Sequence, residues 1–95
     1  MKPYILAPKA DMGYQLILDY IAFHFTETRA LRYEVELFAA LAKLCQNPER
    51  CPVNRIIDGL PVRKYIFQEK TIILYSEREA FVSIDVIADA RTDWK

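Results

Sequence analysis

The charged residues Asp89, Arg91 and Asp93 stand at alternate positions directly after the apolar run Val86–Ala88, and Trp94 follows them. Alternate side chains of an extended strand project from one face, so these three charges would share a surface. A guanidinium pairs in two-pronged fashion with a carboxylate or a phosphate, which a lysine cannot do. We therefore predict either a salt bridge that finishes the sheet edge or a surface that contacts a target. Trp94 would then seal the core or anchor a partner.

Arg63 is a further candidate for contact with a target, because it lies in the β-rich run Val62–Phe67. Neighbouring residues on a strand point to opposite faces, so one of Arg63 and Lys64 should face solvent on the sheet. Arg63 is therefore either a functional contact or a solvated side chain.

Metal ligands are too few to predict a metal site. Cys45 and Cys51 lie six positions apart around Pro48, and His24 is the one histidine. Structural zinc takes four such ligands at compact spacings. In a reducing compartment the two cysteines are expected to be thiols. We expect no metal, and nothing in the sequence calls for a cofactor.

The composition is that of one globular domain over residues 1–95. The chain is 53% hydrophobic and 27% charged, and its 13 basic and 13 acidic residues cancel. Proteins that bind nucleic acid usually carry a basic excess, which is missing here overall. The N-terminus lacks the apolar core of a signal peptide, and no apolar run is long enough to cross a membrane. We therefore expect a cytoplasmic protein without a membrane partner.

Helical periodicity predicts two amphipathic helices. Residues 9–25 carry two neighbouring apolar rows, and a second helix follows Thr26, a plausible N-cap, and ends at Asn47-Pro48. The first helix's rows are Met12, Leu16, Tyr20, Phe23 and Gly13, Ile17, Ile21, His24. The second helix's rows are Leu31, Val35, Phe38, Ala42, Cys45 and Leu37, Leu41, Leu44. The short join makes an antiparallel hairpin.

The rest of the chain is typical of strands. Residues 62–67, 71–75 and 81–88 are rich in Val, Ile, Tyr and Phe and are separated by short polar turns, which predicts an antiparallel meander. The extended residues 3–6 should join an edge of this sheet, since their backbone needs partners. The predicted fold is α+β, in the order β-αα-βββ, with the helical hairpin packed on one face of a mainly antiparallel sheet.

Over its whole length the chain resembles the RelE/ParE superfamily, the toxins of bacterial type II toxin–antitoxin modules. The resemblance rests on the element order and on four stretches: ILDYIA in the first helix, GLPVRKYIF entering the meander, IILYS in its middle strand and VIADARTDW at the end. It implies a cognate antitoxin as partner, the possibility of higher-order toxin–antitoxin complexes, and roles in growth inhibition and plasmid stabilisation.

The superfamily implies two activities. RelE-like members cut messenger RNA on the ribosome, whereas ParE-like members inhibit DNA gyrase by binding it. Here Ile72 stands where the ribonucleases commonly carry arginine, Asp89 replaces a histidine of some relatives, and no tyrosine follows Arg91. The resemblance therefore favours the ParE-like branch, which needs no catalytic residues. A RelE-type endonuclease acting on ribosome and mRNA, or a degenerate member that only binds antitoxin, stays open.

For target binding, the resemblance and the charge pattern together select Arg63 and the terminal residues. Were the chain a ribonuclease, Asp89 and Arg91 would be its catalytic candidates. The set of target-binding candidates is Arg63, Asp89, Arg91, Asp93 and Trp94.

Overall fold

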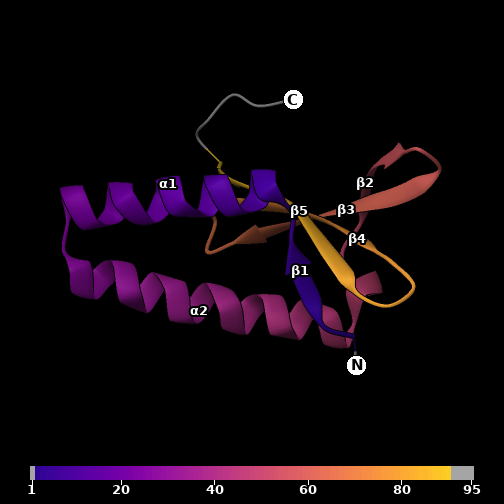
Figure 1. Cartoon of the computed structure of the whole chain (residues 1–95), viewed down its shortest axis with the longest axis horizontal. Coiled ribbons are helices and arrows are strands. Elements are labelled where there is room, and N and C mark those ends of the chain that lie inside the picture. The colour runs from indigo at the N-terminus through magenta and orange to yellow at the C-terminus, as the bar shows by residue number, and fades with distance from the viewer. Residues whose placement is uncertain (1, 91–95) are drawn as a thin grey trace.

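The computed structural model describes residues 2–90 and contains two helices and one five-stranded sheet (Figure 1). The helices are α1 (Pro8–His24) and α2 (Glu27–Gln46), and a short 3-10 turn follows at Pro48–Arg50. The strands are β1 (Tyr4–Leu6), β2 (Val53–Ile57), β3 (Leu60–Phe67), β4 (Thr71–Glu77) and β5 (Val82–Asp89). The predicted α+β architecture is confirmed, with one additional strand.

The strands lie in the order β1-β5-β4-β3-β2. Strand β1 lies at one edge of the sheet, as predicted. It runs parallel to β5, and the remaining pairs are antiparallel. Strand β2 was not predicted. Its hairpin with β3 turns through Asp58 and Gly59, both with positive φ (53° and 80°), the geometry in which an Asp-Gly pair matches the twist of two strands.

Both helices begin where the sequence indicates. Pro8 occupies the first turn of α1, where its missing N–H has no helical partner to lose. At α2 the Thr26 side-chain oxygen accepts a hydrogen bond from the Arg29 backbone N–H at 3.1 Å, so the predicted N-cap is confirmed. The hairpin is also tied across its middle, since the Tyr14 hydroxyl donates to the Glu34 carboxylate.

The helix cap supports a stability prediction. Thr26→Ala should lower the free energy of unfolding by about 1 kcal/mol, because the Arg29 N–H loses its acceptor at an exposed helix end. Urea denaturation of the purified variant measures this. Thr28→Ala, an exposed change two residues further on that removes no cap, is the control and should leave the midpoint nearly unchanged. Equal midpoints for the two variants would mean that the cap contributes nothing.

The core lies between the helical hairpin and one face of the sheet. Its fully buried members include Leu37 and Leu41 of α2 and Ile73, Tyr75 and Ile84 of the sheet. A smaller cluster of Val62, Ile72 and Leu74, joined by Val86, lies on the other face. The α2 row of Leu37, Leu41 and Leu44 is buried against the sheet as predicted. On α1 the buried residues are Ala10 and Tyr14, which the predicted rows did not include, and Ile17 and Ile21 are half-buried beside them.

The other predicted rows, which begin at Met12 in α1 and at Leu31 in α2, are the outer rows and are buried only in part: Cys45 lies in the core and Phe38 packs against it. A single sheet covers only one side of a helix, so most of each outer row stays outside the core. Met12, Leu16 and Phe23 of α1 are 65%, 64% and 84% exposed, and Leu31 and Val35 of α2 are 62% and 69% exposed. The helical hairpin therefore presents apolar side chains to solvent.

Candidate functional site

Asp89 is the last residue of β5, half-buried, and stands opposite Thr71 in the β4–β5 register. Tyr33 of α2 reaches the same place, with its hydroxyl 2.5 Å from the Thr71 hydroxyl and its ring edge-on to Phe67. Burial, and to a smaller extent the charge of Asp89, raise the pKa of Tyr33, although the Thr71 bond opposes this. Tyr33 therefore stays a neutral phenol near neutral pH, able to donate or accept a hydrogen bond.

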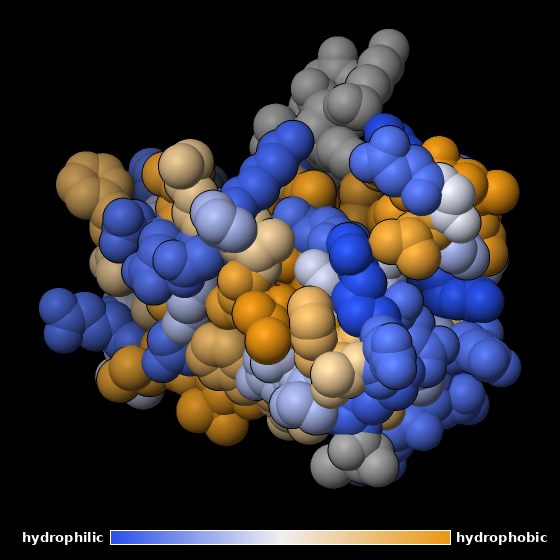
Figure 2. All heavy atoms as spheres, turned by 45° about the vertical axis from the view of Figure 1, so that its right-hand side comes forward, coloured by the Kyte–Doolittle hydropathy of each residue, from blue (hydrophilic) through white to orange (hydrophobic). Residues whose placement is uncertain are grey.

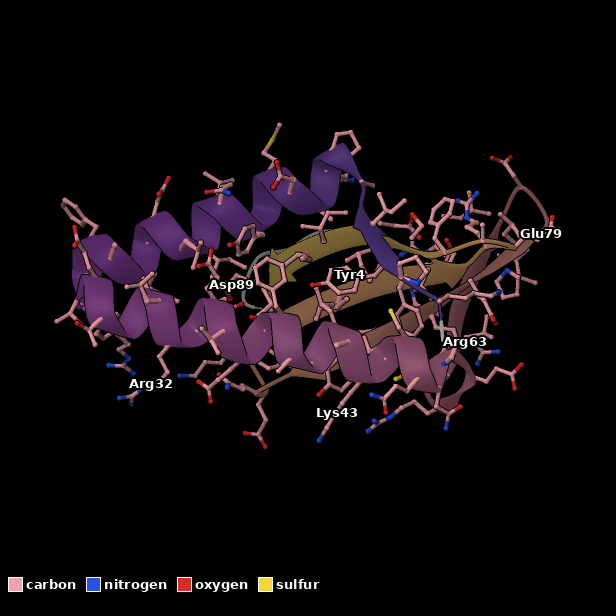
Figure 3. All side chains as sticks on the ribbon, turned by 60° about the horizontal axis from the view of Figure 1, so that its bottom comes forward. Tyr4, Arg32, Lys43, Arg63, Glu79 and Asp89 are labelled. Carbon is pink, nitrogen blue, oxygen red and sulfur yellow. The ribbon has the colours of Figure 1, made fainter. Side chains whose placement is uncertain are left out.

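A cavity of about 670 Å³ opens beside these residues. Its walls come from the second half of α1, the first half of α2, the turn between β3 and β4, and the end of β5. Figure 3 shows Asp89 at the end of the sheet beneath the helical hairpin, and Arg32 reaching outward from α2. The lining residues are Ile17, Tyr20, Ile21, Phe25, Thr26, Thr28, Arg29, Arg32, Tyr33, Glu36, Gln68, Lys70, Thr71 and Asp89.

Three cations stand around this cavity: Arg29, Arg32 and Lys70. The Arg29 guanidinium lies 4.2 Å from the centre of the Phe25 ring, a cation–π contact. Across residues 2–90, none of the three takes part in a salt bridge. Exposed cations without ionic partners are free to pair with acidic groups of another molecule.

Arg63 lies far from Asp89, at the opposite end of β4: it stands opposite Tyr75, whereas Asp89 stands opposite Thr71 (Figure 3). Its guanidinium donates to the backbone carbonyl of Cys51 at 2.6 Å and of Glu49 at 3.3 Å. Arg63 thus acts as a clamp, in the sense that its two hydrogen bonds hold the segment that enters β2. The structure does not bring Arg63 together with Asp89. The other candidates, Arg91, Asp93 and Trp94, lie outside the described residues.

Sequence reasoning missed Tyr33, Thr71 and the three cations, which are distant along the chain and meet only through the topology. One signal was present: Tyr33 lies one helical turn before Leu37, so it continues the inward row of α2. The pairing of β4 with β5 then places Thr71 beside Asp89. Only the combination of helix face and strand register would have found this group.

Cys45 and Cys51 are free and buried, and burial raises the pKa of the Cys45 thiol. Within residues 2–90 no group of three His, Cys, Asp or Glu side chains could hold a metal ion. Neither helix of the described part is long and apolar enough to cross a membrane.

Comparison with known proteins identifies the class and then the family. The chain has the fold of a chromosomal ParDE toxin–antitoxin system structure from P. aeruginosa, with a TM-score of 0.75 over 94% of this chain and 96% of that one, at 15% sequence identity. Residues 4–94 match the family described as the ParE toxin of the type II toxin–antitoxin system, parDE. The chain belongs to this family, which confirms the ParE-like resemblance. A search of the curated proteins finds no match.

Proposed function

We propose that this ParE-family chain is a toxin that acts in the cytoplasm by binding a protein, with DNA gyrase as the target, and that a cognate antitoxin neutralises it. Membership of the family supports the toxin class. The choice of gyrase, and of binding over catalysis, rests on the resemblance to the ParE-like branch and on the chemistry of the described side chains.

The position of Arg63 carries the choice of binding over RNA cleavage. Cleavage by the RNA's own 2′-hydroxyl needs a base, an acid and cations that hold the charge developing on phosphorus. The Arg63 guanidinium is instead engaged by two backbone carbonyls, and Ile72 is 7% exposed, packed beside Val62 and Leu74. Asp89 would add a negative charge next to any phosphate. These features favour a protein target.

The test separates the two activities. Induced expression in a bacterial host should activate the DNA-damage response, and the purified chain should inhibit supercoiling by purified gyrase while ribosome-bound mRNA stays intact. Arg91→Ala is expected to abolish growth arrest, since alanine removes the guanidinium that pairs with carboxylates. Codon-position cuts in mRNA, mapped by primer extension, would instead establish the endonuclease and make Asp89 and Arg91 catalytic candidates.

The exposed outer rows of the helices support the antitoxin as partner. Apolar side chains reach the surface in patches between hydrophilic ones (Figure 2), and Phe23 and Val35 are 84% and 69% exposed. Such patches commonly mark protein interfaces, and a tail that folds on binding can cover them. We expect nanomolar affinity, about −12 kcal/mol, for the product of an adjoining gene.

A further inference from the structure

The helical hairpin is longer than the sheet that it covers. Helices of 17 and 20 residues span about 26 and 30 Å, and their joined end extends past the turn between β3 and β4 (Figure 1). The inward faces of this overhanging end have no strand beneath them. The cavity of about 670 Å³ lies there, within the size range of pockets that hold ligands.

The cavity is apolar along its α1 wall and polar or charged where α2 and the end of the sheet line it. Ile17 and Ile21 line it from α1, and Tyr20 and Phe25 are 44% and 51% exposed beside them. The hydroxyls of Tyr33 and Thr71 lie at the end of the sheet. An apolar side chain that entered the cavity would be removed from water on several sides, and a polar backbone group near it would find hydroxyl partners.

The charges around the cavity favour an acidic peptide over RNA as the bound molecule. Arg29, Arg32 and Lys70 outnumber Glu36 and Asp89 on a chain whose total charge is zero. A polyanion such as RNA would meet the two carboxylates together with the cations. A peptide places its carboxylates singly, so that they can face the cations while its apolar residues avoid the acids.

We propose that this cavity is the docking site for an acidic, amphipathic segment of the antitoxin. One or more apolar side chains of the segment occupy the space between Ile17, Ile21 and Phe25, and its carboxylates face Arg29, Arg32 and Lys70. The inference rests on the proposed function, since it requires that the chain has an antitoxin. It adds the place of contact and the chemistry of the bound segment.

Charge reversal tests the proposal by calorimetry with the purified product of the adjoining open reading frame. Arg32→Glu combined with Lys70→Glu should weaken binding about tenfold, because two exposed cations that attract the carboxylates of the segment become anions that repel them. Binding of the unaltered chain should also weaken with added salt more steeply than binding of the double variant. Lys9→Glu, an exposed reversal in the first turn of α1 away from the cavity, is the matched control and should keep the affinity. Thermal melts verify that all variants fold.

Alkylation locates the contact directly. Thr28→Cys places a thiol on an exposed lining residue of the cavity, and Glu79→Cys places one in the turn between β4 and β5, at the far end of the molecule (Figure 3). The natural cysteines are 5% and 7% exposed and should react slowly. In the saturated complex we expect the thiol at position 28 to be protected from alkylation, and the thiol at position 79 to react as in the free chain.

The possible outcomes separate this inference from the proposed function. If the double variant binds with unchanged affinity, or the thiol at position 28 stays reactive in a saturated complex, the antitoxin docks elsewhere and the inference is wrong, while the proposed function stands. If the unaltered chain binds no product of an adjoining gene, the proposed antitoxin itself is wrong and the inference falls with it.

Discussion

Gly13→Ala should destabilise the protein by about 3 kcal/mol and lower its melting temperature by about 15 °C. A Cβ built on Gly13 would lie 1.8 Å from the backbone carbonyl oxygen of Ile87 and 3.0 Å from its carbonyl carbon. Both atoms belong to the backbone of β5, which is hydrogen-bonded to β1 on one side and to β4 on the other. They therefore cannot move out of the way as a flexible side chain could. Helix α1 would have to move away from the sheet and loosen its packing around Ala10, Tyr14 and Ile17.

The sign of this change is diagnostic. In an open helix, alanine in place of glycine stabilises by up to about 1 kcal/mol, because glycine has the poorer helix propensity. Gln15→Ala, at an exposed position of the same helix, is the control and should change stability little. Thermal and urea unfolding of both variants provide the measurement. A stabilised Gly13→Ala protein would contradict the close approach of α1 to β5.

Gly13 also shows what periodicity could and could not predict. The spacing of apolar residues located both helices and the three strands of the meander, because these depend on local patterns. The edge position of β1 was inferred instead from the need of its backbone for hydrogen-bond partners. It placed Gly13 in an apolar row, but it could not show that Gly13 allows two backbones to meet. That contact joins residues 13 and 87, and it follows from the parallel placement of β1 beside β5.

Strand β2 was missed for a different reason. All five of its residues, Val53–Ile57, are exposed, and the strand has a register shift between Val53 and Arg55. An edge hairpin outside the main core shows no alternation of buried and exposed residues. The Asp58-Gly59 pair between two apolar runs was the available signal, and its positive φ angles confirm the hairpin turn.

The candidate site could be predicted only in part. Asp89 was selected from its place after a buried strand, and it does line the cavity. Its neighbours Tyr33 and Thr71 come from elements whose relative position depends on the helix hairpin and on strand register. The target-contact role of Arg91, Asp93 and Trp94 stays a prediction, because these residues lie outside the described part of the chain.

Arg63→Ala should lower the free energy of unfolding by about 2 kcal/mol. The Arg63 guanidinium donates to the carbonyl oxygens of Cys51 and Glu49, at 2.6 and 3.3 Å. Cys51 is 7% exposed, so its carbonyl would lose a charged donor in a place that water reaches poorly. The segment between α2 and β2 would keep two hydrogen bonds from the sheet: the Tyr75 hydroxyl donates to the Pro48 carbonyl at 2.7 Å, and the Lys64 backbone N–H donates to the Pro52 carbonyl at 3.2 Å.

The neighbouring residue supplies the control for Arg63. Successive residues of β3 point to opposite faces of the sheet, so Lys64→Ala removes a cation from the face opposite to Arg63. It should lower the free energy of unfolding by less than about 0.5 kcal/mol. Urea unfolding and growth arrest are measured for both variants. If Arg63 is a clamp, Arg63→Ala shifts the unfolding midpoint and retains growth arrest wherever the protein is folded. If Arg63→Ala instead keeps full stability and loses growth arrest, the side chain contacts the target, and the binding surface extends to the end of the sheet opposite Asp89.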